Sequence, residues 1–540
     1  MKRFLWMGFV LFLSVICSGC GQTFRPIIIP NPPQFPNPAA SHSVVSINDN
    51  GTIVSGTAMV IDVSGDSQAS VWNVGLAPVH AVQQSASEVL VVNHSVTGAQ
   101  ADSLTKLNFS GTVIFSSNTI SLPANSAPNF VATTESSQAY VLMPNYLDPT
   151  TNVVVPSVQV VNTTANNLVA TIPVGNNPDA MAETPNAQKL YVANQADNTI
   201  SGFNTNPVEH SLSPRTVNGS FNGPLWLIAR SDSQRLYVLN GNGVVSTIDT
   251  TSTLGPDDMV DASVTVPGAA YMLYDGNLNR LYIPAGSQLT ILDVSQSIPA
   301  VLATIPIPPF TLLNIKNSVP ATATAVAALP DGSRAYVASY AVLPSQLNIP
   351  SVSGDGTTAT YAYTLTAGYP LNPGVTVTVS GTKTGFDGAF IVSAIVSGTA
   401  ACPGTCFQTP NATKGTWPPP PPGTSGPASG TGSNVFPQVT VVWATSNTIK
   451  TTVGVPGFPD ATNPTYANGQ YYAPVCATTR FRFMMAAGGD SSRAYLSSCD
   501  GGNVNFIDTS SDSYILDMPA PIGSRLNNPP QNPVFLFAGP

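Results

Sequence analysis

The chain has 540 residues with a formal net charge of −9, and only 8% of its residues are charged. A mild acidic excess without a basic stripe argues against nucleic acid as a partner. Ser, Thr, Asn, Gly and Pro abound, and no convincing helix-period run follows the N-terminus. The composition therefore predicts an almost all-β protein.

The first forty residues resemble an export signal followed by a spacer. A short basic start precedes an apolar run, residues 4–16, that is too short to span a membrane as a mature helix. Cys17-Ser18-Gly19-Cys20 then resembles a bacterial lipobox, although Cys17 stands where Leu is usual. We expect a signal peptide over residues 1–19 and lipid on Cys20, with cleavage to a free N-terminal thiol as the alternative.

Residues 20–40 are rich in Pro and nearly without charge, which predicts a semi-rigid tether that lifts the following domain off the bilayer. Gly21, rather than Asp, follows Cys20, and by analogy this favours the outer membrane over the inner one. The resemblance thus implies a protein of the cell envelope, in the outer membrane, the periplasm or at the surface.

One stretch, residues 185–205, returns along the chain with variations. Residues 190–194 form a short β-prone run, 195–198 have turn chemistry, and 199–203 alternate apolar with small or polar residues, so the unit is a β-hairpin. In the four best copies the spacing from Tyr to the closing Asp or Asn is 13, 12, 11 and 13 residues. The stretch is therefore a true internal repeat.

Weaker copies fill the gaps between the best ones. Seven copies lie at Leu90, Tyr140, Tyr191, Tyr237, Tyr282, Tyr336 and Tyr495. The first six are separated by 50, 51, 46, 45 and 54 residues, close to the period of a propeller blade with four antiparallel strands.

The run Tyr191-Val192-Ala193-Asn194, its copies and the recurring Ile-Asp-Thr ending resemble the YVTN-type β-propeller repeat of the YncE-like family, which borders the lactonase-type propellers. This resemblance implies an all-β propeller over residues 41–342 and 435–540. The family pattern implies seven blades, whereas the strand count favours eight. The C-terminal run 532–540 resembles the opening strand of a blade, so we expect it to close the ring with the N-terminal strands.

The copy at Tyr336 is interrupted, because its next strand does not come until about residues 438–443. Residues 343–434 are therefore read as an insert at a loop tip, where insertion costs little. Within it, residues 358–365, 375–380 and 389–396 alternate like strands and predict a small β module. Its exit, residues 417–423, is a Trp followed by five prolines and Gly, which predicts a spacer; a docking peptide is the alternative.

Four cysteines remain after Cys17 and Cys20, and in the oxidising compartment of an exported protein we expect them to form disulfides. Cys402 and Cys406 suit a local disulfide across a tight turn. Cys476 and Cys499 bracket the first two strands of the last complete blade and make the second pair. Zinc is the alternative, but no His lies nearby.

Catalytic chemistry is not apparent in the sequence. The four histidines show no metal-binding spacing, and no nucleophile elbow, P-loop or dinucleotide fingerprint has a plausible context, so we expect neither metal nor cofactor. The Asp and Asn residues that end the repeats are interpreted as turn residues. The signature residues Tyr140, Tyr191, Tyr237, Tyr282, Tyr336 and Tyr495 are interpreted as packing between blades.

Three further aromatic side chains are candidates to reach the mouth of the central channel: His80, Trp226 and Tyr271. The alternatives are a surface or satisfied loop position for His80 and core packing for Trp226 and Tyr271. Among functions, the sequence favours a monomeric, lipid-anchored binding or scaffolding protein of the envelope, with a protein or polysaccharide ligand. A lactonase-like hydrolase and a structural surface protein acting through the insert are the alternatives, and whether any catalysis occurs stays open.

Overall fold

In a computed structural model, the protein is described at residues 42–51, 54–95, 102–134, 137–205, 214–251, 258–310, 318–368, 370–371, 375–399, 402–418, 428–456, 476, 482–523 and 530–540. The expected signal peptide, Cys20 and the tether lie outside these residues. Every regular element within them is a β-strand, as the composition predicted. A helix that could cross a membrane is not found in this described part of the chain.

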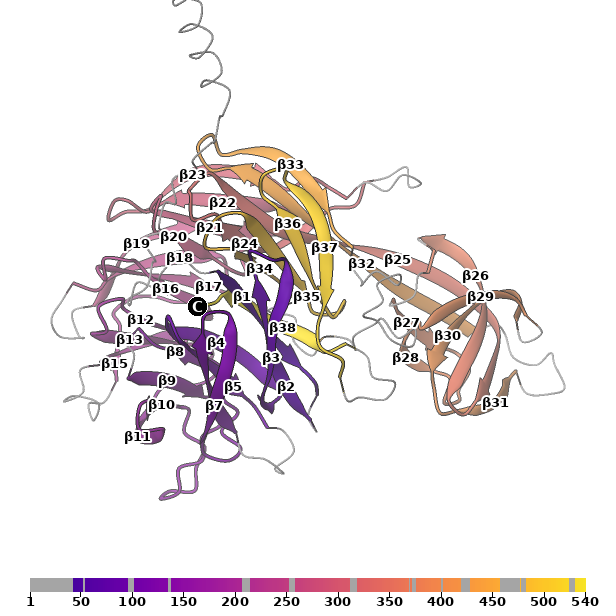
Figure 1. The fold of residues 1–540 in the computed structure, drawn as a ribbon, viewed down its shortest axis with the longest axis horizontal. Helices are drawn as coiled ribbons and strands as arrows, with labels where there is room; N and C mark the ends of the chain where they lie inside the picture. The colour runs from indigo at the N-terminus through magenta and orange to yellow at the C-terminus, as the bar shows by residue number, and fades with distance from the viewer. Residues whose placement is uncertain are drawn as a thin grey trace, which may run out of the picture.

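The described residues form seven four-stranded antiparallel sheets and one ten-stranded sheet, arranged as Figure 1 shows. Six of the four-stranded sheets are single runs of chain, and each is one copy of the sequence repeat with its signature residue on the second strand. They are β4 (Pro78–Ser85), β5 (Glu88–Asn93), β6 (Ser103–Ser110) and β7 (Val113–Ser121); β8 (Phe130–Ala132), β9 (Gln138–Met143), β10 (Ser157–Asn162) and β11 (Asn167–Pro173); β12 (Pro178–Glu183), β13 (Lys189–Asn194), β14 (Thr199–Asn204) and β15 (Arg215–Thr216); β16 (Pro224–Ala229), β17 (Arg235–Asn240), β18 (Val244–Asp249) and β19 (Met259–Thr265); β20 (Leu273–Asp275), β21 (Arg280–Ala285), β22 (Gln288–Asp293) and β23 (Ala300–Pro306); and β34 (Phe483–Ala487), β35 (Arg493–Ser498), β36 (Asn503–Asp508) and β37 (Ser513–Pro519).

The seventh four-stranded sheet, here called the composite blade, joins the two ends of the ring. It contains β38 (Asn532–Ala538), β1 (Ser43–Asp49), β2 (Ser55–Asp62) and β3 (Ser67–Leu76) in that order. β38 pairs with β1 from Ala538 opposite Val44 to Asn532 opposite Asp49. The expected sharing of one blade by the two ends is confirmed, because the first and last described strands of the ring are hydrogen-bonded to each other in one sheet.

The ten-stranded sheet belongs partly to the ring and partly to the insert. Its strands are β24 (Thr322–Ala328), β25 (Arg334–Asp355), β26 (Thr358–Gly368), β27 (Thr376–Ser380), β28 (Gly388–Ile391), β29 (Ala394–Thr399), β30 (Cys402–Pro410), β31 (Lys414–Trp417), β32 (Ala428–Trp443) and β33 (Thr448–Gly454). β24, the start of β25, the end of β32 and β33 fill the ring between two four-stranded blades. One apolar cluster joins Tyr282 to Val337, and another joins Tyr336 to Phe483, so this sheet packs on both neighbours.

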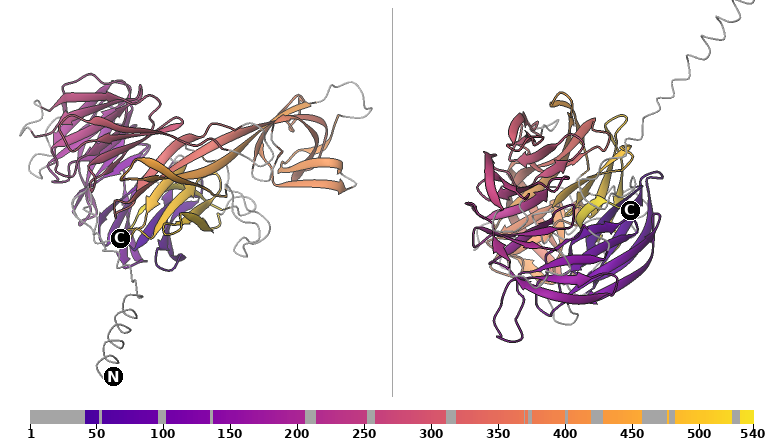
Figure 2. Two further views of the ribbon diagram at one scale, coloured as in Figure 1. Left: turned by 90° about the horizontal axis from the view of Figure 1, so that it is seen from above. Right: turned by 90° about the vertical axis from the view of Figure 1, so that its left-hand side faces the viewer.

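The count of eight four-stranded blades, which the strand count favoured, is therefore corrected to seven. The strands of the Tyr336 repeat do not form a separate sheet, because two of them run on into the insert. β25 and β32 pair without interruption from Arg334 opposite Trp443 to Ile349 opposite Ala428. The result is a long ribbon that carries the insert out to one side of the ring (Figure 2).

The insert is a curled sheet with its own core. Tyr361 and Phe407 stack with ring centroids 4.7 Å apart, and Trp417 is buried against the same cluster. Strands expected over 358–365 and 375–380 are found as β26 and β27, whereas the one expected over 389–396 is divided into β28 and β29. The second ring strand, expected from residue 438, begins earlier, at Ala428, because it starts inside the insert.

Candidate binding site

The three aromatic residues expected near the channel mouth lie in one connected run of rings. His80 stacks on Phe130 with centroids 3.9 Å apart, Phe130 meets the edge of Trp226 at 5.8 Å, and Trp226 lies 5.3 Å from Tyr271. Phe535 of the composite blade approaches His80 from the other side, at 4.5 Å. We call these five side chains the aromatic layer; four come from different sheets, and Tyr271 lies just before strand β20 of a fifth.

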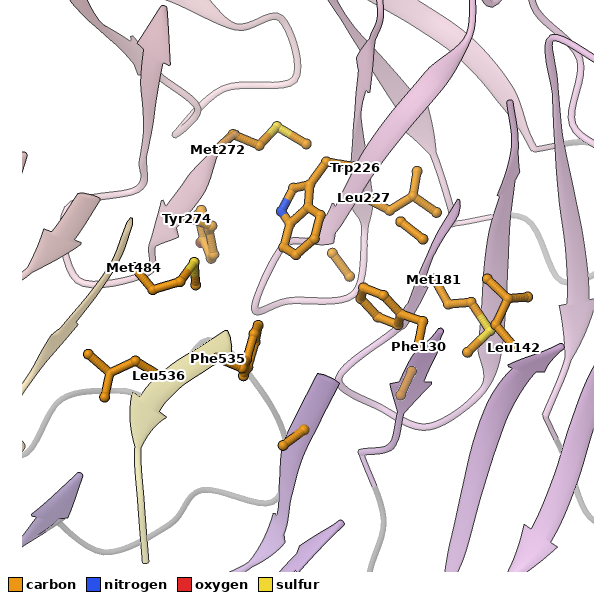
Figure 3. Close-up of a cluster of buried hydrophobic side chains, with 14 of the residues drawn as sticks. Phe130, Leu142, Met181, Trp226, Leu227, Met272, Tyr274, Met484, Phe535 and Leu536 are labelled. Carbon is orange, nitrogen blue, oxygen red and sulfur yellow. The ribbon is translucent and has the colours of Figure 1, made fainter. Parts of the chain in front are cut away.

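The aromatic layer is packed rather than open to solvent. His80 is 5% exposed and Trp226 is 9% exposed, and the Nδ1 atom of His80 accepts the backbone N–H of Val131. Figure 3 shows Phe130, Trp226 and Phe535 pointing into a space that they share with methionine side chains. Trp226 is thus packed in the core, the alternative given for it, whereas Tyr271 is partly buried against the same cluster and His80 is not on a surface loop.

All six signature tyrosines are fully buried. The hydroxyl of Tyr191 donates to Oδ2 of Asp258 at 2.6 Å, and Asp258 lies just before β19 in the next blade. Burial, followed by the Asp258 carboxylate, raises the pKa of Tyr191, and burial raises the pKa of Tyr282 to about 12. These phenols therefore stay neutral at ordinary pH and serve as packing and hydrogen-bonding groups.

Basic side chains connect successive blades, a feature that the sequence reasoning missed. In each case a Lys or Arg of one blade donates to the carbonyl oxygen just after the third strand of the next blade, and we call this contact an inter-blade clasp. The clasps are Lys106 to Thr163 at 2.8 Å, Lys189 to Thr250 at 2.9 Å, Arg230 to Val294 at 3.1 Å, Arg280 to Ala444, and Arg334 to Thr509. Lys189, Arg280 and Arg334 stand two residues before a signature Tyr, so the signal was present in the repeat.

Carboxylates reinforce the clasps on the blade that receives them. Nζ of Lys189 also lies 2.8 Å from Asp258, and Arg334 and Lys450 both pair with Asp512, whose side chain is 1% exposed. Burial opposes ionisation of Asp512, but hydrogen bonds from Lys450, Tyr336 and Arg334 keep its pKa below the usual value. Asp512 is thus a buried anion that is stable only with its cations in place.

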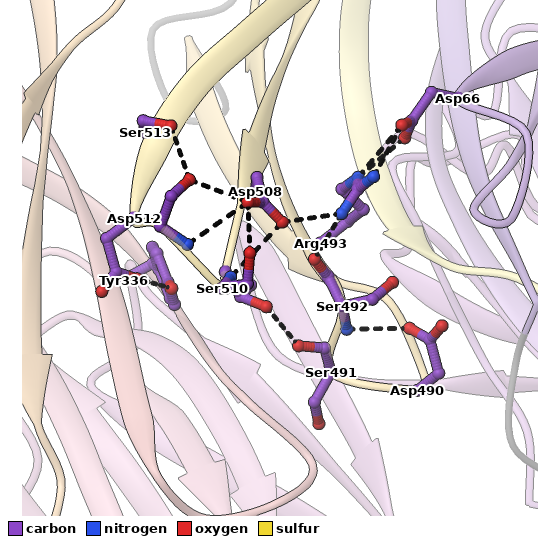
Figure 4. A network of polar contacts seen from close by, with 12 residues as sticks. Asp66, Tyr336, Asp490, Ser491, Ser492, Arg493, Asp508, Ser510, Asp512 and Ser513 are labelled. Atoms are coloured by element: carbon purple, nitrogen blue, oxygen red, sulfur yellow. Dashed lines mark hydrogen bonds and ion pairs between the residues drawn. The ribbon is translucent and has the colours of Figure 1, made fainter. Parts of the chain in front are cut away.

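Among the described residues, an ion pair, without a clasp to a carbonyl, ties the last single-run blade to the composite blade (Figure 4). Arg493 pairs with Asp66 at 2.8 Å across the two blades and with Asp508 at 2.9 Å within its own. Although burial opposes it, hydrogen bonds from Ser510 and Ser511 lower the pKa of Asp508 to about 2. The ring closure therefore has an ionic component besides the shared strand β38.

The Asp and Asn residues that end the third strands behave as turn residues. Asp62, Asn162, Asp249, Asp293 and Asp508 each accept the backbone N–H two residues further on. This is the local bond that a short polar side chain makes in a turn. No group of three or more His, Cys, Asp or Glu side chains that could hold a metal ion occurs among the residues described.

Asn residues at the ends of second strands fix the chain as it enters a new blade. Oδ1 of Asn93 accepts the N–H of Gly75, and Oδ1 of Asn194 accepts the N–H of Gly175, both at 3.0 Å. A Cβ on Gly75 would lie 2.5 Å from the Asn93 side chain, so only Gly permits this approach. The final Asn of the repeat run is thereby explained as a structural residue.

Both expected disulfides are confirmed. Cys402 and Cys406 are joined with their Cα atoms 6.0 Å apart, and Cys476 and Cys499 with theirs 5.6 Å apart. The first pair lies on strand β30 rather than across a free turn. The second bond holds Cys476 to the end of β35, and Asp500 also accepts the N–H of Cys476 at 2.8 Å.

Comparison with known proteins does not place the chain in a family. No protein-family profile matches it, and no curated protein matches it. A solved structure of a functionally unknown protein from Desulfotomaculum acetoxidans shares 11% identity at a TM-score of 0.42 and covers 61% of this chain and 95% of that one.

Two other solved structures show likeness at a similar level. The dihydro-heme d1 dehydrogenase NirN in complex with DHE shares 10% identity at a TM-score of 0.45, covering 90% of this chain and 75% of that one. The Dos1 propeller shares 10% identity at 0.38, covering 52% and 71%. Similarity this low carries no argument about function.

Proposed function

We propose that the protein is an exported, lipid-anchored propeller of the YncE-like type that binds a ligand at the cell envelope. Two disulfides support export, because such bonds persist in oxidising compartments. The lipobox-like run ending at Cys20 supports the anchor. The ring supplies a rigid support, and the insert is the element displayed by it.

The observation that carries this proposal is the position of the insert relative to the first residues of the ring. Ser43, the first residue of β1, pairs with Asp62 beside the turn that holds Asp66, and Arg493 at the start of β35 contacts Asp66. Arg334 at the start of β25 likewise contacts Asp512, in the turn between β36 and β37. The starts of β1, β25 and β35, each the second strand of its blade, therefore lie on one face of the ring.

The insert leaves from the opposite ends of its strands, since β25 enters the insert only after crossing the ring. A tether that precedes β1 would reach the ring at one face, while the insert projects from the other. This arrangement suits a protein that is anchored on one side and presents a binding element on the other.

The proposal is tested by fractionation and capture with the full-length chain. Cys20→Ala should move the protein from the membrane fraction to the soluble fraction, and Cys402→Ala/Cys406→Ala, which leaves Cys20 intact, should not. The full-length protein, immobilised, should retain a specific envelope protein or polysaccharide. Failure to retain either, together with turnover of a lactone panel, would replace the binding proposal by a hydrolase.

The contribution of the insert can be separated from that of the ring. Val342 and Val435 are direct partners across β25 and β32, so residues 343–434 can be replaced by a two-residue Asn-Gly turn. Loss of capture would place the ligand on the insert, whereas unchanged capture would place it on the ring.

A further inference from the structure

One outer face of the insert is a regular grid of hydroxyl groups. On β27 and on residues 429–433 of β32 the outward residues are all Ser or Thr, and they stand directly opposite one another; Thr376 is half-buried and the other five are exposed. The three pairs are Ser380 with Ser429, Thr378 with Thr431, and Thr376 with Ser433. The Oγ atoms of Ser380 and Ser429 are 3.2 Å apart, so one pair is already hydrogen-bonded across the strands.

The neighbouring strand β25 extends this grid with amides. Gln346 is the partner of Thr431, and Asn348 is the partner of Ser429, on the other side of β32. Each row of outward residues across the strands is called a rung. In the third rung the β25 residue opposite Ser433 is Pro344, whose side chain cannot form hydrogen bonds. We call the following eight side chains the hydroxyl face: Gln346, Asn348, Thr376, Thr378, Ser380, Ser429, Thr431 and Ser433.

Strand alternation and a tightly filled interior orient this face outward. Val377, Leu347 and Ile349 point into the insert core and are at most 3% exposed. Between the outward residues of β32 stand Gly430 and Gly432, and a Cβ on Gly432 would lie 2.7 Å from Leu371. The interior leaves no room for side chains there, so all side chains of this part of β32 face solvent.

The chemistry of the hydroxyl face selects its partner. Each Ser or Thr hydroxyl both donates and accepts, as do the Gln and Asn amides beside them, and none of the eight side chains is charged. A protein interface would be expected to offer aromatic or Arg anchors, and a lipid or nucleic-acid surface would need Lys or Arg. A neutral polymer of hydroxyl groups matches the face in both charge and hydrogen bonding.

The spacing also suits a polymer. Neighbouring strands lie about 4.8 Å apart and successive outward residues about 6.7 Å apart, so the face repeats its donors and acceptors in two directions. A chain with repeating hydroxyls can occupy several rungs at once, and many weak contacts then act together.

We propose that the hydroxyl face binds a neutral polysaccharide chain. This assignment rests on the proposed function and names the element and the class of ligand. The ring then supports the hydroxyl face, and the outward side chains of β25, β27 and β32 form hydrogen bonds with the polymer.

The test measures binding of the full-length protein to insoluble cellulose, β-1,3-glucan, mannan and amylose, with alginate and heparin as anionic polymers. Thr378→Ala/Thr431→Ala/Gln346→Ala removes the central rung and should weaken binding to the recognised neutral polymer at least tenfold. Thr378→Ser/Thr431→Ser keeps the hydroxyls and should retain binding. Because these side chains are exposed, the thermal midpoint should not change.

A matched control removes three other exposed threonines of the same sheet: Thr405, Thr416 and Thr452. Their replacement by Ala should leave binding within about threefold of the parent. The assignment is overturned if the chain binds no neutral polymer, binds only the anionic ones, or binds equally well with either triple variant. Capture of an envelope protein without any polysaccharide binding would overturn this assignment and leave the proposed function standing.

Discussion

The ring and the insert are both antiparallel β-structure, but they are held together by different means. Ring sheets are joined by buried tyrosines, inter-blade clasps and ion pairs such as those of Asp258 and Asp512. The insert relies on one aromatic core, with Tyr361 stacked on Phe407, and on the Cys402–Cys406 disulfide, which closes a short loop. In the described residues, the ion pairs join side chains of the ring.

This difference reflects what each region must specify. Repeated blades with similar apolar faces need directional contacts to fix how each one sits on the next. A single curled sheet closes on its own core, and its outer face is then free to carry the uncharged grid described above. Four perturbations would test this contrast.

Removal of residues 532–540 should have the largest effect. Val534, Phe535 and Leu536 are buried in the composite blade, and each such side chain contributes about 1.5–3 kcal/mol. We expect a loss on the order of 6 kcal/mol or failure to unfold cooperatively, measured by calorimetry. Ile515→Ala, at an exposed position on β37, is the control, and an unchanged melting curve for the deletion would contradict ring closure by β38.

Asp512→Asn should come next. The substitution leaves Arg334 and Lys450 without their buried anion, and breaking such a pair costs about 3–5 kcal/mol. Asp293→Asn, at a turn where a partly exposed carboxylate accepts hydrogen bonds from Ser295 and lies near the charge of Arg280, should change the free energy of unfolding by less than about 1 kcal/mol. Equal effects of the two substitutions in denaturant titrations would mean that the clasp is not important for stability.

The two disulfides should differ because they close loops of different length. The bonded cysteines are 23 residues apart in the ring and 4 apart in the insert. Loop-closure entropy gives about 3.4 kcal/mol for Cys476–Cys499 and about 2 kcal/mol for Cys402–Cys406. Cys-to-Ala pairs at each site, compared by chemical denaturation, should follow that order; the reverse order would show that the insert depends on its bond more than the ring does.

Two signature tyrosines make the finest comparison. Tyr191→Phe removes the hydrogen bond to Asp258 and should cost about 1–3 kcal/mol. The buried hydroxyl of Tyr495 has no hydrogen-bond partner among the described residues, so Tyr495→Phe should be neutral or slightly stabilising. If both variants lose the same stability, the hydroxyl of Tyr191 contributes through packing and not through its hydrogen bond.

Much of the ring could be predicted from the sequence, because the same local pattern of strand and turn residues recurs in each repeat. The period of the tyrosines gave the blades, the likeness of residues 532–540 to an opening strand gave the ring closure, and the turn residues gave the strand ends. The cysteines could be paired because few were left to pair. The clasps could have been found as well, since a basic residue recurs two positions before the tyrosine at Lys189, Arg280 and Arg334.

The partners of these repeated residues could not be predicted. Tyr191 and Asp258 are 67 residues apart, and Tyr336 and Asp512 are 176 apart, with no fixed offset between them. The same holds for the hydroxyl face, in which β27 contributes Thr378 and β32 contributes Thr431, from strands that are separated in the chain by β28 to β31.

By itself, the sequence determined the elements that depend on neighbouring residues: hairpins, turns, the buried face of each strand and the strand that closes the ring. Tertiary structure alone decided that the Tyr336 repeat merges with the insert, which Asp neutralises which clasp, and which Ser and Thr residues stand side by side. The physical reason is that strand propensity and alternation are local, whereas ion pairing and cross-strand register depend on which distant segments the closed ring and the long β25–β32 ribbon bring together.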